Sequence, residues 1–380
     1  MRVCLDSRYV RERPSGIGAY VGALIERLPR LAPDSTFELW VHPRAPRPLS
    51  SEPTVTETVV RAPANGLGTL LRPSRLGDLK DIDVLHAPFN LLGRGLQVPT
   101  VVTIHDLMWL DRPTLCEAVS PLLPAKVLFY RDGILRALTR ATRIVTISSA
   151  SADAILARAP RAAPRLRVIP HGVDARFRPP AERAAVERRL DERLGIVDPY
   201  FLVVGQNTPS KNHAAVLHAF ARARLPKNYR LVLLQRLYKS RWGRGLEAEA
   251  RRLGIRHRLL SLPAVTDSEL LELLQGATAL VQFSRFEGFG LPVLEAAACG
   301  TPVVASDIAP LREVMGGAAL HVPLRAEALS RALERIAHDA TLWRELSHAG
   351  LERSREFSWH RSATAHLEVY RDAARAGRGW

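Results

Sequence analysis

Two glutamates, Glu287 and Glu295, stand on either side of a glycine-rich segment and could bind a polar ligand. Gly288 and Gly290 allow a tight turn, and Pro292 suits the first position of a helix, which would place Glu295 in the first helical turn. Carboxylates accept hydrogen bonds from hydroxyl groups, and the free N–H groups of a helix start favour an anion. The pattern predicts a site for a phosphate-bearing, hydroxyl-rich ligand, or a structural turn whose acid only favours the helix dipole.

Lys211 is a further candidate, because a cation in a loop can neutralise charge on a departing phosphate. It follows the apolar run Tyr200–Val204 and a turn over 205–209. Only five of the 54 basic residues are lysines, so a lysine at this place is informative. The alternative is a solvated loop residue.

His105 and Asp106 follow the apolar run Thr100–Ile104, and His86 closes a similar run over 84–86. Polar residues that follow parallel strands collect at one edge of the sheet, where ligands bind in doubly wound folds. His105 and Asp106 could equally form a turn in which the aspartate is a cap.

Two other patterns are less specific. Gly16 and Gly18 precede a helix and could direct N–H groups toward a phosphate. Asp81 and Asp83 form a D-x-D pattern that binds metal in some enzymes. They precede a short strand here, so we interpret them as part of a solvated loop.

These segments, taken together and in order, resemble retaining glycosyltransferase family 4 over nearly the whole chain. The spacing of Glu287 and Glu295 matches the E-x7-E signature of that family. The segment 204–212 is most similar to a branch that contains bacterial mannosyltransferases of O-antigen and exopolysaccharide assembly. The other segments that carry the resemblance are 14–18, 103–106, 146–149, 168–174 and 296–306.

The resemblance implies an α/β protein of the GT-B fold, with two Rossmann-like doubly wound domains facing across a cleft. Residues 1–180 would form the domain that binds the acceptor, and residues 181–360 the domain that binds a nucleotide-sugar donor. Residues 361–380 would form a helical tail that could pack back on the N-terminal domain. Members of the family need no metal and no cofactor.

The resemblance also assigns roles to single residues. Glu295 would bind the ribose hydroxyls, Glu287 the hydroxyls of the donor sugar, and Lys211 the departing diphosphate. His105 would lie by the anomeric centre, so it joins Glu287 and Lys211 as an expected catalytic residue. The implied donor site consists of Gly16, Gly18, Gly205, Lys211, Asn212, Glu287, Gly288, Phe289, Gly290, Leu291 and Glu295, with His86 and Asp106 toward the acceptor.

The sequence departs from the family at one point. Family members usually carry an arginine just after the glycine or just before the lysine of the 204–212 segment. This chain has Gln206 and Ser210 at those places. Arg236, after the next predicted strand, is a candidate replacement.

The implied reaction moves a hexose from a GDP- or UDP-linked sugar to a hydroxyl of a glycan or a lipid-linked saccharide, with the anomeric configuration retained. We expect mannose from GDP-mannose, in the synthesis of cell-surface polysaccharide such as lipopolysaccharide. No carboxylate is placed as a covalent nucleophile, so a front-face mechanism is expected, in which the departing phosphate helps to deprotonate the acceptor. A nucleotide-sugar epimerase on the same fold is the enzymatic alternative.

Alternating apolar and amphipathic runs supply the elements that must position these residues. Short apolar runs alternate with longer amphipathic ones from residue 2 to 169, and the same pattern restarts from 200 to 305. The order strand, helix, strand predicts parallel sheets with crossover helices. A turn at 170–174, a proline-containing stretch and a charged helix over 182–194 separate the two halves.

The 380 residues carry 54 Lys+Arg against 38 Asp+Glu, a formal charge of +16. This charge favours anionic partners, although 49 of the basic residues are arginines, which suggests a compositional habit. The sequence shows no apolar leader and no run of about 20 apolar residues. Cys4, Cys116 and Cys299 lack disulfide or metal-ligand spacing. We expect a cytoplasmic enzyme that is at most peripheral on the inner face of a membrane.

The segment 126–143 alternates apolar and basic residues at near-helical spacing. A basic amphipathic helix could bind an anionic membrane, or it could bury its apolar face in a domain core and leave the basic face solvated. Nucleic-acid binding, a third interpretation of the charge, has no supporting motif. The oligomeric state stays open. The basic residues concerned are Lys126, Arg131, Arg136, Arg140 and Arg143.

Overall fold

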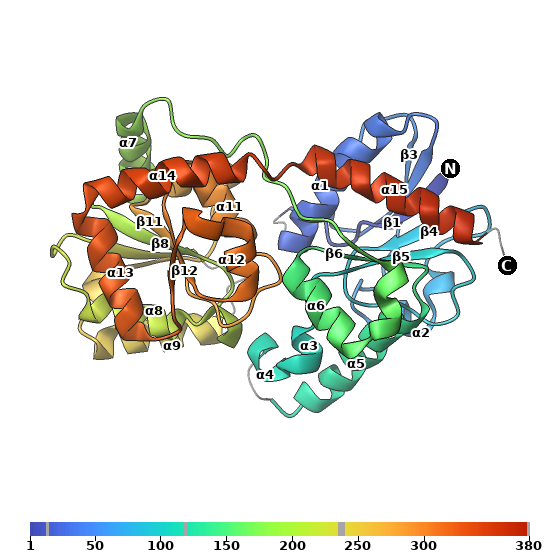
Figure 1. The fold of residues 1–380 in the computed structure, drawn as a ribbon, viewed down its shortest axis with the longest axis horizontal. Coiled ribbons are helices and arrows are strands. Elements are labelled where there is room, and N and C mark those ends of the chain that lie inside the picture. Colours follow the sequence, from blue (N-terminus) through green and yellow to red (C-terminus); the bar gives the residue numbers. More distant parts are fainter. Residues whose placement is uncertain (13–14, 118–119, 235–239, 378–380) are drawn as a thin grey trace. The chain divides into compact units, whose positions relative to one another are not determined.

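The computed structural model describes residues 1–12, 15–117, 120–234 and 240–377 of the chain. The chain divides into two compact units (Figure 1). Unit 1 comprises Met1–Pro113, Val119–Gly172 and Ser358–Trp380, and unit 2 comprises Thr114–Ala118 and Val173–Phe357. Apart from the short segment Thr114–Ala118, the chain leaves unit 1 after Gly172 and returns after Phe357, before the boundaries predicted at 180 and 360.

Unit 1 is built on a parallel sheet that has seven strands within the described residues, in the order β3-β2-β1-β4-β5-β6-β7. Its first six positions follow the 3-2-1-4-5-6 order of dinucleotide-binding folds. The order reverses between β1 and β4, which lie side by side with Val3 opposite Val84. The strands are β1 (Arg2–Asp6), β2 (Thr36–Val41), β3 (Val55–Val59), β4 (Val84–Ala87), β5 (Thr100–Ile104), β6 (Arg143–Thr146) and β7 (Leu166–Val168).

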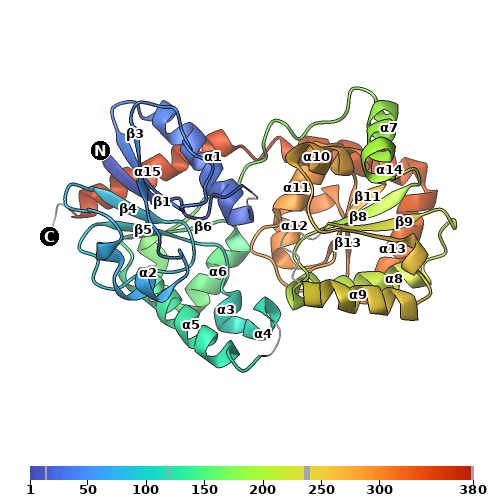
Figure 2. The same cartoon turned by 180° about the vertical axis from the view of Figure 1, so that it is seen from behind.

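Helices cover both faces of this sheet (Figure 2). On one face α1 (Gly16–Leu31) packs against α15 (Trp359–Gly377), and α15 also contacts β4, β5 and β6. On the other face Ile134 of α5 (Leu123–Arg140) and Ile155 of α6 (Ser149–Arg158) pack with Val102. The shorter helices are α2 (Leu67–Leu71), α3 (Met108–Asp111), η1 (Pro73–Arg75) and η2 (Pro160–Arg165), and α4 (Pro113–Cys116) falls mostly in the segment Thr114–Ala118 that is assigned to unit 2.

Unit 2 repeats the doubly wound plan. Its parallel sheet has the order β10-β9-β8-β11-β12-β13 within the described residues, which is again 3-2-1-4-5-6. The order reverses between β8 and β11, where Phe201 lies opposite Ala279. The strands are β8 (Tyr200–Val204), β9 (Arg230–Leu234), β10 (Leu259–Leu262), β11 (Ala279–Gln282), β12 (Val303–Ser306) and β13 (Leu320–Val322).

The unit 2 sheet also lies between two layers of helices (Figures 1 and 2). On one face, Phe220 of α8 and Leu333 of α13 pack with Phe201 in a hydrophobic core. On the other face, α11 contacts β11 and β12. The helices are α7 (Arg183–Leu194), α8 (His213–Arg222), α9 (Ser240–Arg252), α10 (Asp267–Gly276), α11 (Leu291–Ala298), α12 (Ala309–Met315), α13 (Ala326–His338) and α14 (Ala340–Ser354), with η3 (Pro209–Lys211), η4 (Arg256–Arg258) and η5 (Gly316–Ala318).

The predicted α/β class and the two Rossmann-like sheets are confirmed. The structure adds two edge strands that the sequence pattern did not predict, β3 and β13. β3 has valine only at its two ends, with threonine and glutamate between them, and stays partly exposed, and β13 is only three residues long. Neither is an apolar run, because an edge strand is covered on one side only.

The basic segment over 126–143 is not one helix. α5 ends at Arg140, and Arg143 begins strand β6, so the prediction that places Arg143 on the helix is wrong. Ala141 has extended backbone, and its buried side chain joins the core under α5, which stops the helix there. On the helix itself Arg136 forms an ion pair of 2.6 Å with Asp132.

Candidate active site

Lys211 and Glu287 meet at the carboxyl edge of the unit 2 sheet. Lys211 Nζ lies 2.6 Å from Glu287 Oε1, with the lysine side chain 24% and the glutamate side chain 9% exposed. Lys211 follows β8 and Glu287 follows β11, the neighbouring strands between which the strand order reverses. Doubly wound folds bind ligands at this point, because the loops of the two strands turn away from each other there. The pair therefore lies where a ligand of unit 2 is expected.

Two side chains that the sequence did not single out complete the surroundings of the Glu287 carboxylate. Gln282 Nε2 and Ser284 Oγ each donate a hydrogen bond of 2.6 Å to Glu287 Oε1. With Lys211, three donors therefore share one oxygen, and hydrogen bonds to a charged acceptor are the strong ones. Among the described residues no donor binds Glu287 Oε2, which leaves that oxygen to accept hydrogen bonds from a ligand.

The sequence did contain a signal for Gln282. It ends the otherwise apolar strand β11 and is 2% exposed, and burying an amide at the end of such a strand is costly unless it is bonded. Its Nε2 is bonded, but its Oε1 is buried with no hydrogen-bond partner among the described residues. Burying an amide oxygen without a partner costs free energy of folding. We infer that glutamine is kept at this position for the hydrogen bond that it donates to Glu287.

The turn after β8 holds Lys211 by its backbone. Gly205 has φ 149°, in the region that favours glycine, and the stem of Lys211 packs 3.6 Å from the place where a Cβ would be. The Lys211 N–H donates to Thr208 O at 3.0 Å. Asn212 follows with φ 58°, a left-handed conformation that asparagine tolerates, and α8 begins at the next residue. The lysine therefore projects from a tightly constrained turn.

The glycine segment after β11 is equally constrained at Gly290. Its φ is 100°, and a Cβ there would lie 2.6 Å from Cδ2 of Leu311. The Phe289 side chain is buried and meets the Phe357 ring edge-on, with centroids 5.8 Å apart. α11 begins at Leu291, directly after the left-handed glycine. Neither Gly290 nor its neighbours can move freely without disturbing this packing.

One prediction about this segment is wrong. α11 has no acidic residue in its first turn, because the helix begins at Leu291 and Glu295 is its fifth residue. Glu295 is partly buried in the second turn. Its place as a binding residue stays a prediction, but it does not sit at the helix start.

His213, the first residue of α8, is a buried polar group beside this site that the sequence did not single out. It is 2% exposed, and its Nδ1 has no hydrogen-bond partner among the described residues. Burial, together with the nearby charge of Lys211, lowers the pKa of His213 to about 4. The ring is therefore neutral at pH 7 and adds no second cation next to Lys211.

His105 lies at the carboxyl end of β5 in unit 1 and is held on three sides. Its N–H donates to Asn90 Oδ1 at 2.8 Å, and its carbonyl accepts from Ser151 Oγ at 3.0 Å. The ring Nε2 is 2.8 Å from the carbonyl oxygen of Pro88, which can only accept, so Nε2 carries the proton. Burial lowers the pKa of His105 to about 4, which makes the ring neutral at pH 7.

His86 is fully buried and has both ring nitrogens engaged. Nδ1 lies 2.7 Å from Tyr370 Oη and Nε2 lies 2.8 Å from Thr103 Oγ1. These contacts join α15 to the sheet of unit 1, and the place of His86 on the acceptor side stays a prediction. Burial lowers the pKa of His86 well below its usual range.

The other predicted residues of unit 1 are at the starts of helices. Gly18 is buried, and its N–H donates to Oγ of Ser15, the N-cap of α1, so that donor already has an acceptor. Gly16 is exposed at the first position of the helix. Asp106 Oδ1 accepts from the N–H of Met108 at 2.8 Å, so this carboxylate caps the turn into α3.

Ser210 and Gln206 stand at the places where family members usually carry an arginine. Ser210 is buried, and its carbonyl accepts from the N–H of Arg285 at 2.7 Å, which ties the two loops of the site together. Gln206 is exposed. Arg236 lies outside the described residues, as does Pro14 of the 14–18 segment.

No cluster of three or more His, Cys, Asp or Glu side chains in the described ranges could hold a metal ion. Asp83 instead accepts a hydrogen bond of 2.8 Å from the N–H of Arg2, which lies in the neighbouring strand. None of the helices in the described part of the chain is long and apolar enough to cross a bilayer.

Comparison with known proteins agrees with this arrangement of elements. Family models match in both halves, "Glycosyltransferase Family 4" over residues 14–177 and "Glycosyl transferases group 1" over 188–353. The MMP alpha-(1->4)-mannosyltransferase of Mycolicibacterium hassiacum is 32% identical over 321 residues, which cover 80% of this chain and 74% of that protein. The O-antigen chain mannosyltransferase B of Escherichia coli is 29% identical over 311 residues, covering 80% and 78%.

The likeness extends to the fold. The structure of a sucrose-phosphate synthase from Thermosynechococcus elongatus superposes with a TM-score of 0.78 at 22% identity, over 98% of both chains. Together with the two Rossmann-like sheets, this assigns the predicted GT-B fold. The family models and the 32% identical relative establish the rest: the chain is a glycosyltransferase that belongs to glycosyltransferase family 4.

Proposed function

We propose that the protein transfers mannose from GDP-mannose to a hydroxyl of a glycan or lipid-linked saccharide, with retention of the anomeric configuration. The similarity to the two mannosyltransferases supports the choice of sugar. The O-antigen relative supports an acceptor in cell-surface polysaccharide synthesis. Such an acceptor would place the enzyme in the cytoplasm, on the inner face of the membrane.

The observation that carries the proposal is the pair Lys211 and Glu287 at the switch point of unit 2. The ammonium group of Lys211 would move from the carboxylate to the diphosphate and neutralise the charge that builds up as it leaves. Gln282 and Ser284 would keep the carboxylate in place when Lys211 moves, because they bind the same oxygen.

Other residues would then complete the donor site. Glu287 Oε2 would accept hydrogen bonds from hydroxyls of the donor sugar, and Glu295 would bind the ribose hydroxyls. His105 would lie by the anomeric centre. The constrained glycines Gly205 and Gly290 would let the backbone approach the nucleotide sugar.

We further propose that the reaction needs no metal ion. Lys211 would supply the charge neutralisation that a divalent cation gives in other transferases. Transfer would proceed on the front face of the sugar, where the departing phosphate accepts the proton of the attacking hydroxyl.

A thermal-shift panel of GDP-, UDP-, dTDP- and ADP-sugars tests the donor. A ligand at 100 times its dissociation constant should stabilise the protein by about 2.7 kcal/mol. We expect GDP-mannose to give the largest shift, and the variant Glu287→Gln to lose most of it. A larger shift with another nucleotide would refute the assigned donor.

Product analysis tests the reaction itself. With GDP-mannose and a mannosyl oligosaccharide, an α-linked product should form at an unchanged rate in the presence of EDTA. A β-linked product would contradict retention, and abolition by EDTA would contradict metal independence. An epimerised nucleotide sugar formed without acceptor would favour the epimerase instead.

A further inference from the structure

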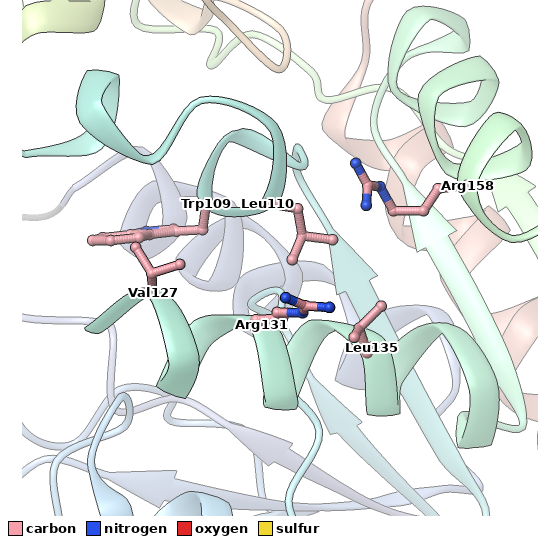
Figure 3. Close-up of a pocket in the computed structure, with 6 residues that line it drawn as sticks. All are labelled: Trp109, Leu110, Val127, Arg131, Leu135 and Arg158. Carbon is pink, nitrogen blue, oxygen red and sulfur yellow. The ribbon is translucent and has the colours of Figure 1, made fainter. Parts of the chain in front are cut away.

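A cavity of about 220 Å³ lies in unit 1 between α3, α5 and the end of α6 (Figure 3). Its lining residues differ from all those assigned to the transfer reaction. Val127, Arg131 and Leu135 are spaced four residues apart on one face of α5. The full lining is Trp109, Leu110, Val127, Arg131, Leu135 and Arg158.

The apolar wall of this cavity is preformed. The Trp109 ring stacks on Tyr130 with centroids 4.1 Å apart and planes inclined by 16°. Tyr130 in turn meets the Phe129 ring edge-on at 5.2 Å. Because stacked rings hold each other in place, the indole presents a fixed apolar surface to the cavity.

Two guanidinium groups line the same cavity, and they differ in their partners. Arg158 is directed from the end of α6 toward α3, where it forms an ion pair with Asp111. Arg131 is exposed, and no described residue forms an ion pair or hydrogen bond with it. Within the described part of the chain, one cation at the cavity therefore has a carboxylate partner and the other has none.

The chemistry of these walls selects a ligand with two parts. Arginine presents a planar fork of donors that matches phosphate oxygens, so Arg131 would bind an anionic head, while the charge of Arg158 is already balanced by Asp111. The remaining lining is tryptophan, leucine and valine, which would contact methylene groups. The volume is below that of a typical site for a drug-sized molecule, so a long chain must continue outside.

A surface for such a chain exists on the same helix. Leu128 is 68% exposed next to Val127, and Leu122 is 66% exposed just before the helix begins. We propose that the cavity binds the phosphate head and first carbons of an anionic amphiphile, and that its chain runs over these leucines. The inference concerns binding alone and does not depend on the proposed transfer reaction.

Calorimetric titration with decyl phosphate below its micelle concentration tests the inference. We expect saturable binding of decyl phosphate to the unaltered protein. In Arg131→Gln the dissociation constant should rise at least tenfold, because a charged group that would bond to the phosphate is lost. The matched control is Arg140→Gln, an exposed arginine of the same helix outside the cavity, which should bind as the unaltered protein does. Leu135→Trp, which fills the cavity, should also abolish binding, and circular dichroism should show that each variant is folded.

Three further probes decide between interpretations. If inorganic phosphate binds as tightly as decyl phosphate, the proposal that the site recognises an alkyl chain is wrong. If decyltrimethylammonium binds equally well, the proposal that the site recognises an anionic head is wrong. Absence of binding, or an equal loss in Arg140→Gln, would overturn the site. Flotation with phosphatidylcholine vesicles, with and without phosphatidic acid, then identifies the source. Flotation that depends on Arg131 would identify the ligand as a membrane lipid. Binding of decyl phosphate without flotation would identify it as a soluble amphiphile.

Discussion

Gln282→Leu is the sharpest test of how Glu287 is held. Leucine keeps the approximate volume of glutamine but cannot donate the 2.6 Å hydrogen bond to Glu287 Oε1. A hydrogen bond to a charged group contributes about 1.5–3 kcal/mol. If all of that serves to place the carboxylate for the donor sugar, kcat/KM for the nucleotide sugar should fall by about 10- to 150-fold.

Stability should respond differently from activity. Gln282 Oε1 is buried and has no hydrogen-bond partner among the described residues, so removing it relieves a desolvation cost of about 1–3 kcal/mol. This gain offsets the lost bond to Glu287, and we expect the free energy of unfolding to change by less than about 1 kcal/mol. A large loss of activity with little loss of stability is therefore the expected signature.

The assay compares kcat/KM with two binding constants. Because Glu287 is assigned to the sugar, Gln282→Leu should weaken the binding of the nucleotide sugar. The binding of the free nucleoside diphosphate should stay unchanged. Gln275→Leu is the matched control, since Gln275 is also buried in unit 2 but donates to the carbonyl of Arg178 at 2.8 Å. It should lose stability and keep kcat/KM. The reasoning is refuted if Gln282→Leu retains kcat/KM within twofold, or if it weakens the free diphosphate equally.

Three other predictions follow from the same structure. Glu287→Gln should lower kcat/KM by about 100- to 1000-fold with an unchanged circular dichroism spectrum, and near-normal transfer would remove Glu287 from the site. Gly290→Ala forces alanine to φ 100° in a crowded place and should cost about 2–4 kcal/mol in urea denaturation, while Gly317→Ala, which has open space, should be nearly neutral. Burial lowers the pKa of His105 and of His366 to about 4, below the value near 6.5 of an unfolded chain, so the unfolded state binds more protons between these pH values. Stability should thus fall as the pH drops from about 6.5 to 4, and each histidine should account for a loss of about 2 kcal/mol at pH 5. Urea denaturation at several pH values measures this loss. Midpoints that stay constant over this range would contradict the burial of these rings.

Much of the candidate site could be predicted because of what parallel sheets do to sequence. Lys211 and Glu287 are 76 residues apart, yet each follows an apolar strand by a few residues. The carboxyl ends of parallel strands share one edge, so two such loops come together when their strands are neighbours. The glycine turn and the strand ends could be predicted because both depend on residue types that are close together in the chain.

The local pattern did not reveal which partners a polar group would find. His86 and His105 look alike in the sequence, since each follows an apolar run. In the structure, Tyr370 arrives from α15, far along the chain, and engages His86 Nδ1. Glu295 was displaced from the first helical turn because the helix begins at Leu291 rather than at the proline.

By itself, the sequence determined the fold class, the family, and the two loops that bring Lys211 and Glu287 to one edge of unit 2. The fold class and the two loops follow from the alternation of apolar runs, which is a local property of the chain, whereas the family follows from the resemblance carried by segments such as 204–212 and by the spacing of Glu287 and Glu295. Only the tertiary structure decided that Gln282 and Ser284 share an oxygen of Glu287 with Lys211, and that Arg131, which has no ion-pair partner among the residues described, lines a cavity. The physical reason is that hydrogen bonds and cavities depend on which side chains meet in space, and packing between distant segments sets those meetings.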